Sequence, residues 1–147
     1  MLDRARILEL IPHQGTMCLL EEVAEWSNSS IACLTYSHQS PDNPLRRSGR
    51  LHGICGIEYG LQAAALHGAL LAGDLQPPGY LAALRSVEIF TERLDDPSIG
   101  VLQVTAQLEL RDVRGLIYRF LLRSGNGAAL LSGQATIVLP AAVTGAA

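Results

Sequence analysis

The sequence contains no lysine, few aromatic residues and no long hydrophobic run. All 11 basic residues are arginine, which is typical of a GC-rich genome; aromatic residues make up 5% of the chain and charged residues 17%. A net charge of −3 argues against a nucleic-acid-binding protein. No apolar stretch reaches the roughly 18 uncharged residues that a membrane span needs, since Gln62 and His67 interrupt the richest one, residues 61–73.

Three cysteines, Cys18, Cys33 and Cys55, are too widely spaced to form a CxxC pair. This predicts reduced thiols and no metal site. The N-terminal segment contains acidic residues and no small-residue cleavage site, so we expect no signal peptide and a cytoplasmic location. With 48% hydrophobic residues, we expect one folded domain over residues 1–140, followed by a disordered tail over 141–147.

The hydrophobic pattern predicts a short helix, two strands, a long helix and then about four strands. The short helix covers 3–11, with Asp3 as its N-cap and Pro12 at its end. Segments 17–26 and 30–37 are expected to be strands, and a polar loop covers 38–50. The long, buried helix covers 51–72, and the later strands cover 80–93, 100–111, 116–123 and 128–139. Elements segregated in this way indicate an α+β fold.

Small residues follow one another along the long helix at spacings of three and four: Gly53, Gly56, Gly60, Ala64 and Gly68. This spacing places them on one face, where the absence of large side chains allows another backbone to approach closely. In a chain otherwise made of strands, we expect a curved antiparallel sheet to cover this face. Periodicity alone predicts a sheet with one buried helix.

Glu58 is the most unusual residue of the long helix. Its neighbours are apolar, so an ionised carboxylate is costly there unless it is paired or hydrogen-bonded. Gln62 lies one turn later and is placed to hydrogen-bond it. A carboxyl group whose pKa is raised by an apolar pocket suits general acid catalysis. The alternative is that Glu58 lies on an exposed edge of the helix.

Other polar groups gather near the start of this helix. The free N–H groups of the turn 52–56 can hold a developing oxyanion, although its glycines also suit simple packing. His13, in the loop P-H-Q-G, is either a functional residue or an ordinary surface histidine. Arg46, Arg47 and Arg50 precede the helix and can bind a phosphate or an acidic carrier protein, or simply form a solvated loop.

Two segments resemble the 3-hydroxyacyl-[acyl-carrier-protein] dehydratase family of hotdog proteins. Residues 11–23, I-P-H-Q-G-T-M-C-L-L-E-E-V, are similar to the family's N-terminal P-H-R…L-L-x-D-x-V segment. Residues 53–62, G-I-C-G-I-E-Y-G-L-Q, are similar to the family helix that carries P-G…E-x-x-A-Q, and the strand segment 79–87 also fits. The resemblance extends over nearly the whole chain and is greatest to divergent members from polyketide-type and aryl-polyene clusters.

The resemblance implies a hotdog fold, in which an antiparallel sheet wraps around one long central helix. It also implies a lyase that converts carrier-bound 3-hydroxyacyl thioesters to trans-2-enoyl thioesters in fatty-acid or polyene-type biosynthesis. Glu58 would be the catalytic carboxylate, Gly53 a backbone oxyanion donor, and Gln62 a residue that holds the helix and the site together. The histidine of the family's G-H-F-P-G loop is absent, because S-G-R-L-H-G stands at 48–53. We therefore expect His13 to be the base that takes the C2 proton, with His52 as the second choice.

The implied reaction needs no cofactor, since a phosphopantetheine arm carries the substrate. The expected partners are an acyl carrier protein, bound by Arg46, Arg47 and Arg50, or a CoA thioester. A second hotdog subunit would complete a homodimer or a heterodimer. Two alternatives remain open. One is a hotdog acyl-thioester hydrolase in which Glu58 activates water, and the other is an inactive partner subunit of a heterodimeric dehydratase.

Overall fold

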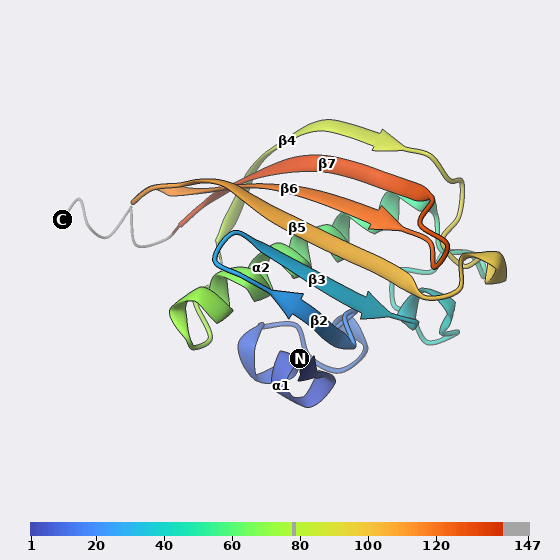
Figure 1. Ribbon diagram of the computed structural model, residues 1–147. Coiled ribbons are helices and arrows are strands. Elements are labelled where there is room, and N and C mark those ends of the chain that lie inside the picture. The colour runs from blue at the N-terminus through green and yellow to red at the C-terminus, as the bar shows by residue number, and fades with distance from the viewer. Residues whose placement is uncertain (78, 140–147) are drawn as a thin grey trace.

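One antiparallel sheet curves around one long helix in the computed structural model, which describes residues 1–77 and 79–139. The seven strands follow the order β1-β2-β3-β5-β6-β7-β4, and the helix is α2 (Gly56–Ala72). The other elements are β1 (Leu2–Asp3), α1 (Arg4–Leu10), β2 (Glu22–Trp26), β3 (Ser30–Thr35), β4 (Tyr80–Ile89), β5 (Leu102–Arg111), β6 (Gly115–Arg123) and β7 (Ala129–Val138). Figure 1 shows the sheet wrapped over α2, with α1 beside β2. This is the predicted hotdog fold.

The first helix forms largely as its sequence predicts. The side chain of Asp3 accepts a hydrogen bond from the Arg6 N–H at 3.1 Å, which caps the first turn of α1. Ile7 and Leu10 are buried beneath it. The two-residue strand β1, which pairs with β2 just before this cap, was not predicted because two residues carry no periodic pattern.

Three predicted boundaries differ most from the structure. The strand expected from residue 17 begins at Glu22, because Gly15–Met17 form a 3-10 helix. The long helix expected from residue 51 begins with a 3-10 turn over Gly53–Cys55. The strand expected to reach residue 93 ends at Ile89, and the chain beyond it bonds to the segment before α2 instead, through Gly53 N–H to Glu92 O (2.9 Å) and Leu94 N–H to Leu51 O (2.7 Å). The expected tail at 141–147 lies outside the described residues.

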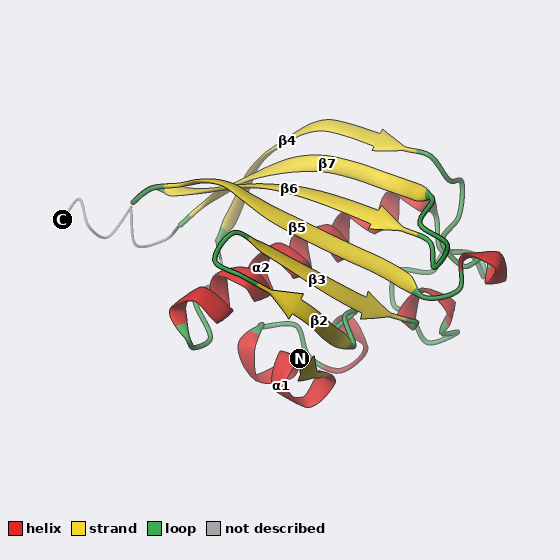
Figure 2. Ribbon diagram, in the orientation of Figure 1, coloured by secondary structure: helices red, strands yellow, loops and turns green. Residues whose placement is uncertain are grey.

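Glycines bring α2 close to the sheet, as the small-residue pattern predicted. A Cβ atom on Gly60 would lie 2.4 Å from the Phe120 ring, and one on Gly133 would lie 2.8 Å from the other end of that ring. The ring of Phe120, fully buried, therefore fits between the helix and β7 only because both positions lack side chains. Figure 2 shows the resulting two layers, with the strands on one side and α2 on the other.

The two edges of the sheet differ. β1 is two residues long and continues directly into α1, so little backbone is left unpaired there. β4 is ten residues long, pairs with β7 alone among the described strands, and carries exposed apolar side chains at Tyr80, Leu81, Leu84 and Ile89. A long apolar edge of this kind is able to pair with another chain. Among the described residues, no helix is long and apolar enough to cross a membrane.

Candidate functional site

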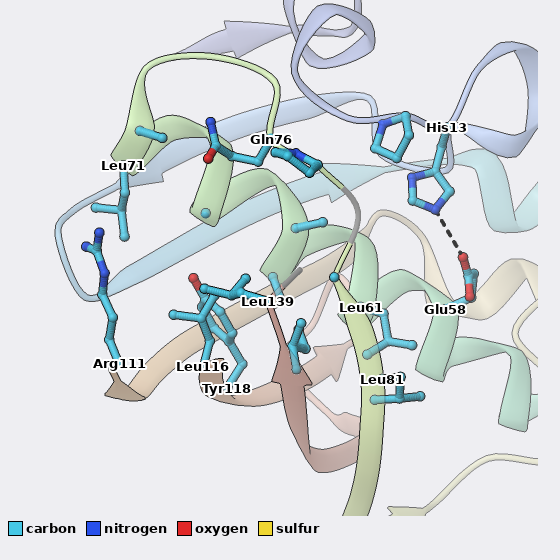
Figure 3. Close-up of a pocket in the computed structure, with 18 residues that line it drawn as sticks. His13, Glu58, Leu61, Leu71, Gln76, Leu81, Arg111, Leu116, Tyr118 and Leu139 are labelled. Carbon is cyan, nitrogen blue, oxygen red and sulfur yellow. Dashed lines mark ion pairs between the residues drawn. The ribbon is translucent and has the colours of Figure 1, made fainter. Parts of the chain in front are cut away.

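A pocket of about 470 Å³ runs between one face of α2 and the ends of several strands (Figure 3). Its walls are mainly apolar, with Leu61 and Leu71 on the helix facing Leu81, Leu116 and Leu139 on or beside the strands. His13 and Glu58 lie together at one end, and Figure 3 shows Arg111 at the opposite end. The pocket thus combines a long apolar interior with a histidine and a carboxylate at one mouth, and an interior of this kind is suited to an apolar ligand.

His13 and Glu58 come from different elements and meet at this mouth. His13 lies in the loop after α1, Glu58 lies in the first turn of α2, and 3.6 Å separates His13 Nε2 from Glu58 Oε1. Their side chains are 26% and 32% exposed, so both are partly shielded yet open to a ligand. Nε2 is the nitrogen that faces Glu58, and Nδ1 is buried with no hydrogen-bond partner among the described residues.

Gln62 fastens the segment after His13 to α2. Its side-chain amide donates to Met17 O at 2.7 Å, and its Oε1 accepts from the Leu19 N–H at 2.9 Å. Gln62 is fully buried, so both bonds are shielded from water. The predicted hydrogen bond between Gln62 and Glu58 acts beside these two contacts, because it is one of the causes that lower the pKa of that carboxyl. Arg4 steadies the same loop by donating to Gly15 O at 2.6 Å.

The expected rise in the pKa of Glu58 was wrong. The His13 ring beside it lowers the pKa of this carboxyl, partial burial acts in the opposite direction, and the Gln62 amide lowers it further. The carboxylate is therefore the favoured form of Glu58 at neutral pH. The sequence showed the apolar neighbours along the helix but not the imidazole that the N-terminal loop brings to them.

Gly53 is placed for packing. Its N–H donates to Glu92 O at 2.9 Å, and a Cβ atom at this position would lie 2.1 Å from Thr91 O. The prediction that this amide is an oxyanion donor was therefore wrong, because its hydrogen bond is already made within the chain. His52 lines a separate, shallow depression with Ile89 and Phe90, away from the pocket that holds Glu58.

The three loop arginines fall into two groups. Arg46 is turned inward: its Nε donates to Ser40 O at 2.8 Å and its guanidinium lies 3.7 Å from Asp95. Arg47 and Arg50 pair through their backbones across a tight turn, and both are exposed. Neither has an ion-pair partner in the described parts of the chain. Only two of the three predicted carrier-binding side chains are thus presented to solvent.

Two other histidines are structural. His67 is fully buried, with Nε2 2.8 Å from Ser27 O and Nδ1 2.7 Å from the Tyr118 hydroxyl. His38 is also fully buried and bonds Gly100 O. Burial lowers the pKa of each ring. In the described residues, no three His, Cys, Asp or Glu side chains gather as a metal site would require.

Sequence reasoning missed the far part of the pocket. Gly68, Tyr118 and Arg111 all line it, but they come from α2, β6 and β5. Gly68 belonged to the small-residue pattern, which predicted packing there; Arg111 and Tyr118 carried no local signal. They meet because β5 and β6 are paired in the sheet that covers the C-terminal end of α2.

Comparison with known proteins identifies one family. The family described as ApeP dehydratase matches residues 5–146. No match was found among curated proteins. A solved dehydratase heterocomplex, ApeI:P from Xenorhabdus doucetiae, superposes with a TM-score of 0.80 at 23% identity, covering 91% of this chain and 90% of that one.

Two further solved structures share the fold. One is a hypothetical thioesterase with coenzyme A from Streptococcus pneumoniae TIGR4 (TM-score 0.58, 15% identity, 80% of this chain and 84% of that one). The other is the E. coli PaaI protein from the phenylacetic acid degradation operon (TM-score 0.60, 9% identity, 80% and 81%). At these identities the likeness establishes the fold and not the reaction.

Proposed function

Because the chain belongs to the ApeP-like dehydratase family, we propose that it removes water from 3-hydroxyacyl thioesters to form trans-2-enoyl thioesters. The observation that carries this proposal is the 3.6 Å contact between His13 and Glu58 at one end of an apolar pocket. Dehydration needs a base for the C2 proton and an acid for the departing 3-hydroxyl, and an imidazole beside a carboxyl can supply both.

The lowered pKa of Glu58 supports its carboxylate as the base. Glu58 takes the proton from C2, and His13, in its protonated form, gives the Nε2 proton to the 3-hydroxyl. The C3–O bond breaks, the electrons of the C2–H bond form the double bond, and water leaves. The pair then holds its one proton on Glu58, and transfer of that proton to Nε2 restores the starting state. The roles expected from the sequence are thereby exchanged.

The pocket supports an acyl chain as the part of the substrate that is bound. Leu61, Leu81 and Leu116 offer apolar contact over its interior. We propose that a phosphopantetheine arm delivers the thioester to the mouth at His13, and that the exposed Arg47 and Arg50 bind an acidic acyl carrier protein. A role in fatty-acid or polyene-type biosynthesis is consistent with such a substrate.

We further propose that the free edge of β4 pairs with a second hotdog subunit. The edge is long and apolar, whereas the opposite edge is short and joined to α1. Leu81 of β4 also lines the pocket, so a subunit docked on this strand would lie next to the site. The partner is either a second copy of this chain or a related dehydratase subunit, as in the ApeI:P heterocomplex.

The reaction is tested by incubating the purified chain with a 3-hydroxyacyl-carrier thioester and measuring intact mass. Loss of one water is expected. Glu58→Gln and His13→Gln should each lower the rate by about 10²- to 10⁴-fold, the range typical of general acid–base groups. His52→Gln is the matched control and should leave the rate unchanged, because His52 lies in a separate depression.

Other outcomes identify other functions. Release of the whole acyl group would identify a thioester hydrolase, with Glu58 activating water. The chain would be identified as an inactive partner subunit if it left the thioester unchanged by itself and dehydration occurred only when a second subunit was added. The rate of dehydration by that complex would then be unaffected by Glu58→Gln in this chain. A loss of rate in His52→Gln equal to that in His13→Gln would overturn the assignment of the pair.

A further inference from the structure

We propose that the pocket selects acyl chains whose far end carries an anionic oxygen acceptor, a carboxylate above all, and that Arg111 is the residue that recognises it. This inference rests on the proposed function, because it treats the pocket as the acyl site. It concerns the end of the substrate furthest from the reacting carbons. Arg111 would thus determine specificity and would take no part in the chemistry.

The pocket is long enough for its two ends to act separately. Residues of α2 line it from Glu58 to Ala72, at positions 58, 61, 64, 65, 68, 71 and 72, which form one face of the helix. Ala72 lies fourteen positions after Glu58, a distance of about 21 Å along an α-helix. Figure 3 shows Glu58 and Arg111 at opposite ends, with leucine side chains between them. A short acyl group at His13 would leave the Arg111 end empty, and a long one would reach it.

Arg111 is free to bind a ligand. No carboxylate lies within ion-pair distance of it in the described residues, and the neighbouring Asp112 lies 3.9 Å from the guanidinium of Arg114 instead. Arg111 lies at the last position of β5, opposite Leu116 of β6, and lines the pocket. Among the described residues, this exposed cation beside an apolar wall therefore has no ion-pair partner.

The other polar groups at this end are already bonded. Ser27 O can only accept, so the His67 ring carries its proton on Nε2 and its Nδ1 accepts the Tyr118 hydroxyl hydrogen. The Gln76 amide nitrogen donates to Asp74 O and Leu75 O. Among the described lining residues here, Arg111 is therefore the charged donor left for a ligand, and its planar guanidinium suits a carboxylate that accepts two parallel hydrogen bonds.

The test is a binding measurement that needs no turnover. Saturated acyl-pantetheine thioesters lack the 3-hydroxyl, so they cannot be dehydrated. Two series of increasing chain length are compared, one ending in a carboxylate and one in a methyl group, by titration calorimetry. For chains long enough to reach Arg111, we expect the wild-type protein to bind the carboxylate series about tenfold more tightly, as for a hydrogen bond to a charged group. Short chains should show no such preference.

Two variants test whether Arg111 causes the preference for carboxylate-ended chains. Arg111→Met keeps much of the side-chain length without the charge, and should abolish the preference while methyl-ended chains still bind. Arg114→Met, an exposed arginine three residues further on, is the matched control and should retain the preference. Equal binding of both series by the wild-type protein, or a preference that survives Arg111→Met, would overturn this inference alone. Failure to bind either series would overturn the acyl-site proposal as well.

Discussion

One row of small residues on α2 meets two different environments. Gly56 and Gly60 lie against the sheet, where a Cβ atom would come within 2.9 Å of Leu122 and 2.4 Å of Phe120. Two turns further on, a Cβ atom on Gly68 would meet nothing within 4 Å. Ala64, between them, is buried and lines the pocket.

The difference shows that a small residue on a buried helix has two separate uses. At Gly60 it allows another element to fill the space, and at Gly68 it leaves the space open as part of the pocket. The sequence pattern is the same in both cases, because the spacing reports only which face a residue is on. Whether a bulky side chain from the sheet arrives at that point depends on β6, which places Phe120 opposite Gly60.

The largest expected effect on stability comes from Gly60→Ala. The added methyl group would overlap the Phe120 ring, and overpacking of this kind costs about 1–3 kcal/mol. Urea denaturation of the wild-type protein and of the Gly60→Ala variant measures this loss in the free energy of unfolding. Gly68→Ala is the matched control: it adds the same methyl group to open space, and helix propensity predicts up to about 1 kcal/mol of added stability. Equal losses at both positions would contradict the contrast between them.

The pH dependence of stability tests the packed side of α2 in its C-terminal half, opposite the open space at Gly68. His67 is next to Gly68 in the chain but lies on the packed side, where burial lowers the pKa of its ring. The unfolded chain therefore binds this proton more readily than the folded one. Stability should fall as the pH drops from about 7 to 5, through the ordinary histidine range. His38 contributes with the same sign, because burial also lowers its pKa.

Thermal unfolding measured between about pH 7 and pH 5 gives the change of stability with pH. His67→Gln should be less stable at neutral pH, because it breaks the buried bonds to Ser27 and Tyr118, but its slope with pH should be smaller. Glu58 does not contribute to this change of stability, because it titrates at lower pH. Its lowered pKa contributes stability above the ordinary carboxyl pKa, and that stability is lost only at more acidic pH. An unchanged slope in the variant would show that His67 does not titrate as its burial requires.

The smallest expected effect on stability, and the clearest on selectivity, comes from Gly68→Leu. The leucine side chain would extend into the pocket, so the free energy of unfolding should change by less than about 1 kcal/mol. Long 3-hydroxyacyl thioesters should lose about tenfold in kcat/KM through steric exclusion, whereas short ones should react normally. Rates over a series of chain lengths test this. Equal losses for short and long substrates would indicate that the chain does not pass Gly68.

Local patterns in the sequence were enough for most of the elements and for a sheet with one buried helix, and the family resemblance supplied the hotdog fold. Asp3 predicted the cap of α1, alternating residues predicted the paired strands, and the apolar run with its glycines predicted a helix covered by a sheet. Glu58 was identified as a candidate because a carboxylate among apolar neighbours is costly wherever the helix lies. His13 was identified through the resemblance of its motif, and its role together with that of Glu58 stays a prediction.

Only the tertiary structure decided how the candidate groups act on one another. It placed His13 beside Glu58, which lowered the pKa that the apolar neighbours were expected to raise. It used the Gly53 N–H and the Gln62 amide in internal hydrogen bonds, and it brought Arg111 to the far end of the pocket. A local pattern follows from the period of the helix or strand, whereas pKa values, free donors and cavities depend on contacts between residues far apart in the chain.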